Sequence, residues 1–223
     1  MKRLNEFFDN LFTIIPGYIF GLLTFVVGFS GFIIALLLSP EYIMWKKSIS
    51  VLGHHPGGIF SRIGLIISNT IAIPFLIYFG RFLKDEDMNE NIRKIAVGAG
   101  IIISVNAVLT GAVSGGGLSD LHGLFALLSW IGGVVGCLLF GLLMLRSSKY
   151  SKSAAYFSFI IAGIFGSYLI PFFITNFCSA FPDICGSFGR RVYTIMPVYE
   201  WVIMFSILFW YLLNSIYILH KEI

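Results

Sequence analysis

Polar side chains able to do chemistry are few in this sequence, and they gather in short segments between long apolar runs. The richest segment is SISVLGHHPGGIFSR, residues 48–62, and SGGGLSDLHG, residues 114–123, follows further along. The titratable side chains in these segments and just before the last apolar run are His54, His55, Arg62, Asp120, His122, Arg190, Arg191 and Glu200. Only folding can bring the three segments together, and two kinds of site fit their chemistry.

The first kind of site binds an anionic lipid head group. Gly57 and Gly58 lead into an apolar run, so we expect free backbone N–H groups at a helix N-terminus beside Arg62. Arginine suits phosphate because its planar guanidinium donates two hydrogen bonds at once. The predicted head-group ligands are His54, His55, Gly57, Gly58, Arg62, Arg190 and Arg191.

The second kind of site is a metal centre that activates water on a lipid ester or amide. Neutral imidazoles and carboxylates are good zinc ligands, and an open coordination position would serve hydrolysis. The ligand set predicted for this alternative is His54, His55, Asp120, His122 and Glu200. Zinc is the expected cofactor of this alternative, and the head-group site needs no cofactor.

A third interpretation assigns these residues no pocket chemistry. Asp120 directly before an apolar run is typical of a helix N-cap, and Glu200 early in the last run suits the helix dipole. Histidines and arginines at a membrane boundary often simply reach for water. The protein would then be a structural or partner subunit of a membrane complex, and the three interpretations leave enzymatic activity open.

The elements that position these residues are membrane helices. Of the 223 residues, 57% are hydrophobic and 12% are charged, and the mean hydropathy is +0.90, which indicates an integral membrane protein. The net charge of +4 does not indicate a nucleic-acid partner, because the basic residues stand in short segments between the apolar runs. Membrane lipid is the expected partner.

Six runs are long enough to cross a bilayer as helices, which takes about 20 residues each. They are continuously apolar, unlike the alternating strands of a barrel. Before Pro16, residues 4–15 place apolar side chains at helical spacing, which predicts a short amphipathic helix in the membrane interface. We therefore predict an all-α fold with one domain, residues 1–223, whose spans are about 17–38, 59–82, 95–113, 124–145, 154–173 and 198–219.

Lysines and arginines predict the orientation of these spans. With both termini on one side, that side holds ten of the 15 basic residues and the other side holds Lys46, Lys47, Arg62, Arg190 and Arg191. By the positive-inside rule both termini face the cytoplasm of a cell membrane. Cys178 and Cys185 then lie in an outer loop, where they are either a disulfide or two free thiols.

Small residues at helical spacing predict close helix packing inside the bundle. The spacing occurs at Gly21, Gly28 and Gly31, at Gly132 and Gly136, and at Gly163 and Ser167. The same faces would serve association with a second copy or with a partner membrane protein. No Asp, Glu, Lys, Arg or His lies near the middle of a run, which argues against ion-coupled transport.

Three segments carry a resemblance to a known family. SISVLGHHPGGIFSRIGLIISN (48–69), DLHGLFALLSWIGG (120–133) and YEWVIMFSILFW (199–210) resemble parts of a prokaryotic six-helix membrane family, domain of unknown function 998. That family is similar in layout to the Frag, DRAM and Sfk membrane proteins. The resemblance implies six helices and, through the eukaryotic relatives, an association with lipid remodelling or membrane lipid asymmetry. His54 and His55 stand where the family pattern has small residues.

The predicted orientation can be tested by labelling intact cells with a membrane-impermeant thiol reagent. A cysteine introduced at Gly116 should react, and one introduced at Met88 should react only after the cells are opened, because the two positions lie on opposite sides of the membrane. The reverse pattern would place the titratable segments in the cytoplasm and remove the basis for an outward site.

Overall fold

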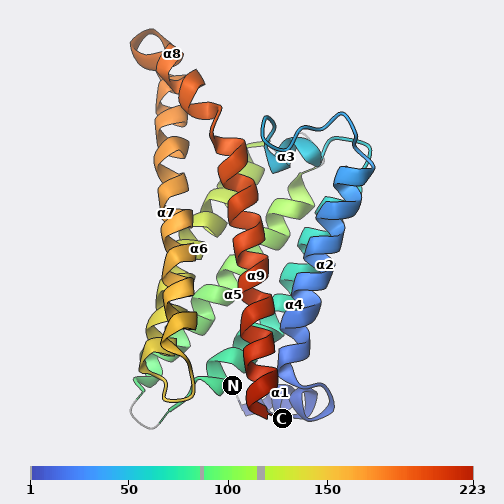
Figure 1. Ribbon diagram of the computed structural model, residues 1–223, viewed down its shortest axis with the longest axis vertical. Coiled ribbons are helices and arrows are strands. Elements are labelled where there is room, and N and C mark those ends of the chain that lie inside the picture. Colours follow the sequence, from blue (N-terminus) through green and yellow to red (C-terminus); the bar gives the residue numbers. More distant parts are fainter. Residues whose placement is uncertain (1, 86–87, 115–118, 223) are drawn as a thin grey trace.

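A computed structural model of the chain describes residues 2–85, 88–114 and 119–222. Within these three ranges all regular secondary structure is helical, as Figure 1 shows, so the predicted all-α fold is confirmed. The helices are α1 (Lys2–Ile14), α2 (Gly17–Leu37), α3 (Ile49–Leu52), α4 (Gly58–Phe82), α5 (Glu90–Val113), α6 (Ser119–Arg146), α7 (Lys152–Ala180), α8 (Pro182–Tyr193) and α9 (Met196–Glu222).

Six helices are long and apolar enough to cross a membrane, and they correspond to the six predicted spans: α2, α4, α5, α6, α7 and α9. The chain is therefore a multi-pass membrane protein with a six-helix bundle. The largest difference from prediction is in α7, which continues from the predicted end at Phe173 to Ala180. Its 29 residues make a helix of about 43 Å, longer than the roughly 30 Å thickness of a hydrocarbon layer.

The six long helices form a closed ring in chain order. Each packs beside the next, and α9 closes the ring by packing against both α7 and α2. Both termini lie at one end of the bundle, here called the terminal end, and α3 and α8 lie at the opposite, distal end (Figure 1). The segments predicted to carry chemistry therefore converge at the distal end, around the mouth of the ring.

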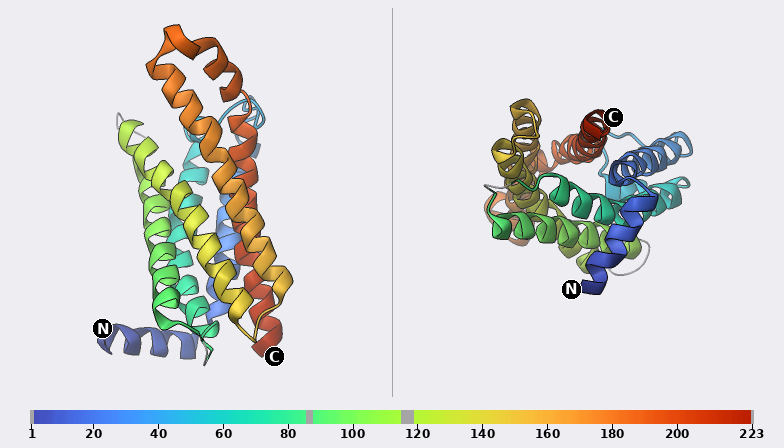
Figure 2. Two further views of the ribbon diagram at one scale, coloured as in Figure 1. Left: turned by 90° about the vertical axis from the view of Figure 1, so that its left-hand side faces the viewer. Right: turned by 90° about the horizontal axis from the view of Figure 1, so that it is seen from below.

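The amphipathic helix α1 lies across the terminal end, at a large angle to the long helices (Figure 2). Asp9 forms an ion pair with Arg81 of α4 at 2.6 Å, and the Phe12 ring meets the Tyr78 ring edge-to-face at 5.1 Å. The guanidinium of Arg81 also lies over the Phe12 ring. These contacts join the predicted interfacial helix to the bundle and keep it away from the distal site.

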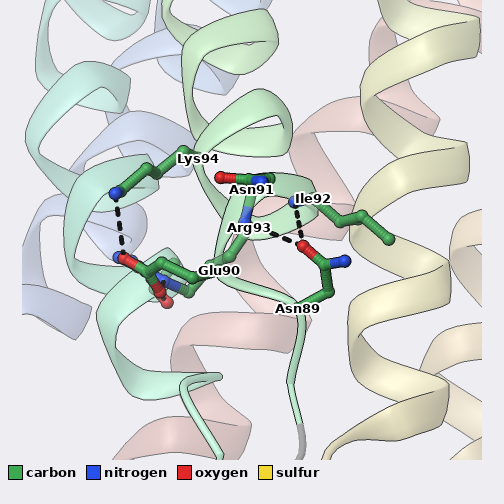
Figure 3. Close-up of polar contacts among 7 residues, drawn as sticks. Asn89, Glu90, Asn91, Ile92, Arg93 and Lys94 are labelled. Carbon is green, nitrogen blue, oxygen red and sulfur yellow. Dashed lines mark hydrogen bonds and ion pairs between the residues drawn. The ribbon is translucent and has the colours of Figure 1, made fainter.

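The start of α5 is fixed by a side-chain cap and by an arginine that reaches α4. The Asn89 side chain accepts hydrogen bonds from the N–H groups of Asn91 and Ile92, as an N-cap does (Figure 3). Arg93 pairs with Glu90 one turn away and donates to the Gly80 carbonyl of α4 at 3.2 Å. The cap and the arginine bridge fix the register of α5 against α4.

Glycines let α2 and α4 approach each other closely. A Cβ on Gly31 would lie 2.8 Å from the Cα of Gly64 and 2.9 Å from the Phe60 carbonyl oxygen, both backbone atoms of α4. Gly132 and Gly136 of α6 instead make room for the side chain of Ile103 of α5. These predicted packing faces are therefore occupied within one copy of the chain.

Other glycines are not packing residues. At Gly163 of α7 nothing lies within 4 Å of an added Cβ, so this position faces outward. Association with a second copy or a partner through the glycine faces stays a prediction. Gly98 of α5 and Gly123 of α6, like Gly163 of α7, have open space around an added Cβ.

The glycine contact predicts a matched pair of variants. Gly31→Ala should lower the free energy of unfolding by about 1–3 kcal/mol, because two helix backbones must separate to admit the methyl group. Gly163→Ala adds the same methyl group into open space and should be neutral or slightly stabilising, since alanine is the better helix former. Thermal unfolding of the detergent-solubilised proteins measures both, and equal midpoints would contradict the packing.

Candidate functional site

A cavity of about 140 Å³ opens at the distal end, within the ring of helices. Most of its wall is apolar, with Phe32, Trp130 and Ile203 among the larger side chains. The polar side chains that line it are Ser50, Ser61, Arg62, Asn69, Thr110, Ser114, His122, Ser129 and Glu200. Such a mixture of apolar walls and a few polar groups is typical of small-molecule sites.

A second cavity of about 70 Å³ adjoins the first on the side of the terminal end. The two share wall residues that include Leu65, Asn69 and Met204. The lower cavity ends against Phe140 and Trp210, which belong to the aromatic core of the bundle. Polarity therefore falls with depth, from the charged side chains at the mouth to an apolar floor.

Glu200 fixes the position of the short helix α3, here called the roof of the larger cavity because it lies over the distal mouth. Its side chain is 8% exposed, and one carboxylate oxygen accepts the backbone N–H of Ile49 at 2.8 Å. The other oxygen accepts the Tyr168 hydroxyl of α7 at 3.0 Å. Glu200 thus connects α9 with α7 and with the short helix α3, which belongs to the α2–α4 connector, residues 38–57.

Tyr42 and Trp201 form a second attachment between this connector and α9. The indole N–H of Trp201 donates to the Tyr42 hydroxyl at 3.2 Å, and that hydroxyl donates to the Lys47 carbonyl at 2.6 Å. Desolvation by burial raises the pKa of the Tyr42 phenol to about 12, so the hydroxyl keeps its proton at neutral pH. The connector is therefore held at two successive residues of α9.

His122 of α6 reaches the connector from the opposite wall. Its Nε2 lies 2.9 Å from the Ser50 hydroxyl, one residue after Ile49. Its Nδ1 lies 3.0 Å from the Ser114 hydroxyl and 3.1 Å from the Thr110 carbonyl, both at the end of α5. The imidazole is therefore held on both sides, and it joins α5, α6 and α3 at the mouth of the cavity.

Arg62 is the cation of the cavity. It lies one turn into α4 and lines the cavity. Its aliphatic carbons pass beside Gly53, where an added Cβ would lie 3.9 Å from them. Its Nε is buried without a hydrogen-bond partner, and within the described ranges the guanidinium forms no ion pair. A buried donor on a charged group is costly to leave unpaired, so the Nε of Arg62 is a hydrogen-bond donor available to an acceptor in the cavity.

The predicted glycine ligands have a structural role. The N–H of Gly57 donates to the Ser39 hydroxyl at 3.1 Å, and the N–H of Gly58 donates to the His55 carbonyl at 2.8 Å. A Cβ on Gly57 would clash with the Ala35 carbonyl oxygen of α2. These N–H groups are used within the protein, and the glycines allow the connector to pass close to α2.

Several other predicted ligands lie outside the cavity lining. His54 is exposed, with Nδ1 3.0 Å from the Ser50 carbonyl, and the His55 ring packs edge-on against Tyr42 at 5.5 Å. Asp120 is exposed in the first turn of α6. Arg190 and Arg191 are exposed on α8.

Of the predicted head-group ligands with a charged side chain, only Arg62 lines the cavity among the residues that the structure describes. Of the predicted metal ligands, His122 and Glu200 do. Across residues 2–85, 88–114 and 119–222, no three His, Cys, Asp or Glu side chains are grouped to hold a metal ion. The zinc alternative stays a prediction, with no arrangement of these five residues to support it.

Cys178 and Cys185 form a disulfide, with their Cα atoms 5.0 Å apart. It ties the last turn of α7 to α8, and Gly189 of α8 packs directly against the Cys178 side chain. Of the two states that the sequence leaves open, the structure has the bonded one. The bond shapes the projecting tip of the distal end, away from the cavity lining.

Reasoning from the sequence missed four polar residues of the site: Ser50, Thr110, Ser114 and Tyr168. Serine and threonine are common in membrane helices, where they usually bond to a carbonyl of the preceding turn. Nothing in the spacing of these three, or in the position of Tyr168, marks them as different. They gain a role through partners on other helices, which no local pattern reports.

Comparisons with models of known protein families, with characterised proteins and with solved structures find no match. The function therefore has to be argued from the geometry of the site.

The role of Glu200 can be tested by substitution. Glu200→Ala removes both acceptors and should cost about 1–3 kcal/mol for each donor left unpaired, at Ile49 and at Tyr168. Hydrogen exchange at residues 49–53 should become faster, because α3 loses its attachment. Glu41→Ala, at an exposed carboxylate of the same connector, should change neither quantity. Unchanged exchange in Glu200→Ala would show that Glu200 does not hold the roof.

Proposed function

We propose that this membrane protein binds an anionic membrane amphiphile in the distal cavity, with the head group against Arg62 and the hydrocarbon chain in the apolar part. The observation that carries the proposal is the Arg62 guanidinium, which lines an apolar cavity and has a buried Nε without a partner. A lipid supplies the acceptor that Arg62 lacks and a hydrocarbon chain that matches the apolar wall.

Charge favours an anionic head group. A guanidinium in apolar surroundings is expensive unless it is paired and hydrogen-bonded. Glu200 lines the same cavity, but its two oxygens accept from Ile49 and Tyr168, and it forms no ion pair with Arg62. A phosphate or carboxylate would meet the planar fork of Arg62 with two parallel hydrogen bonds.

Depth favours an amphiphile over a small soluble anion. From Arg62 to Leu76, which lines the lower cavity, α4 rises by about 21 Å at 1.5 Å per residue. Along that distance the walls change from polar to apolar. A hydrocarbon chain lying along this path would exchange the apolar bilayer for apolar walls, whereas an inorganic anion has no apolar part to place there.

The orientation predicted from the basic residues is part of the proposal. With both termini in the cytoplasm, the distal cavity opens at the outer leaflet of the membrane. Its ligand would then be a lipid of that leaflet, and the protein would hold or present that lipid. The resemblance to domain of unknown function 998 would imply an association with lipid remodelling, and it stays a prediction because no family model matches.

Native mass spectrometry of the protein purified from its own membrane tests the proposal. The wild type should retain an anionic lipid, and Arg62→Gln should lower the affinity for that lipid about 10-fold to 100-fold and retain less of it, because one charge-assisted hydrogen-bonding partner is lost. Zwitterionic lipid should not replace it when both are offered in nanodiscs.

Arg190→Gln is the matched control, because it removes the same charge from the same end of the protein at an exposed position on α8. It should retain lipid as the wild type does. Equal retention by Arg62→Gln and the wild type, or equal loss in both variants, would overturn the proposal.

A further inference from the structure

We infer that Ser50 and His122 are a nucleophile and its general base for acyl transfer from a lipid ester bound in the distal cavity. The Ser50 hydroxyl lies 2.9 Å from Nε2 of His122, within the range that proton abstraction requires. Both residues line the cavity that also contains Arg62. The inference rests on the proposed function, because the ester must be bound there to react.

The partners of Nδ1 determine which nitrogen of His122 carries the proton. The Thr110 carbonyl, 3.1 Å away, can only accept a hydrogen bond. The Ser114 hydroxyl donates its own proton to that carbonyl at 2.5 Å, so it too accepts from the imidazole. Nδ1 therefore bears the hydrogen in the neutral ring, and the lone pair of Nε2 faces Ser50.

This tautomer is the one that a serine nucleophile needs. In serine hydrolases a third group holds Nδ1–H so that Nε2 can take the proton of the hydroxyl. Here the end of α5 supplies that group through a carbonyl and a hydroxyl. Asp120, two residues before His122, is exposed in the first turn of α6 and is not needed for this arrangement.

The surroundings of Ser50 suit a bound ester. Ser50 follows Ile49, whose N–H is held by Glu200, so the hydroxyl is positioned by the same contact that fixes the roof. The Ser50 side chain is exposed at the mouth, where water can reach it. Arg62 in the same wall carries the positive charge that would stabilise both an anionic head group and the oxyanion of the transition state.

The reaction has two balanced steps. In the first, Nε2 of His122 takes the hydroxyl proton while the Ser50 oxygen bonds to the ester carbonyl carbon, and the alcohol leaves with that proton. In the second, a water molecule gives a proton to Nε2 and its oxygen attacks the acyl group, and the Ser50 oxygen leaves and regains the proton. The products are a fatty acid and an alcohol, and water is the co-reactant.

A purely structural Ser50–His122 hydrogen bond would join α3 to α6 without making the serine reactive. An alkyl fluorophosphonate separates the two roles, because it phosphonylates activated serines. With the purified full-length protein in nanodiscs, peptide mass spectrometry should find the adduct on Ser50. Ser50→Ala should abolish it, and His122→Gln should slow its formation about 100-fold or more.

Ser48→Ala is the matched control, since it removes a hydroxyl from the same connector two residues away and should label at the wild-type rate. Native lipid retention, measured on each variant, reports folding and binding independently of labelling.

An unlabelled Ser50 in a protein that retains its lipid would overturn the acyl-transfer inference and leave the binding proposal standing. Labelling of His122→Gln at the wild-type rate would overturn it as well, and loss of lipid in both Arg62→Gln and Arg190→Gln would instead overturn the binding proposal.

Discussion

The hydrogen bond from the Ile49 N–H to the Glu200 carboxylate is the contact on which the distal site depends. It holds α3 over the mouth of the ring and so places Ser50, the next residue, within reach of His122. The same carboxylate also accepts from Tyr168, which connects α9 to α7 where the ring closes. A backbone N–H at the edge of a membrane needs a hydrogen-bond acceptor, and the acceptor supplied by Glu200 fixes the position of α3.

A half-buried cation, Arg62, and an imidazole held in one orientation, His122, are the groups that could do chemistry in the cavity. Arg62 offers an unpaired donor, and His122 is held on both sides by α5 and α3. A donor left unpaired on a charged side chain is costly in apolar surroundings, and this applies to the Nε of Arg62. The two proposals assign them to the same ligand, the first through its charge and the second through its ester bond.

The sequence predicts the fold well because a membrane helix needs a long apolar run, and each of the six runs became a helix. It predicts α3 and α8 poorly because both are short and lie in polar connectors. For the site, crowding of polar residues indicates the correct end of the bundle but not the direction of each side chain. Arg62 points into the ring, whereas His54, in the same segment, points to solvent.

The ring is packed differently at its two ends, and this difference explains why a cavity persists. Toward the terminal end, Phe79 stacks on Phe140 at 5.3 Å and meets Trp210 at 5.5 Å, so large rings fill the interior. At the distal end the wall includes Ala107 and Ala126, whose small side chains leave space between the same helices. An amphiphile fits such a gradient, because its polar head stays at the mouth while its chain continues toward the aromatic core.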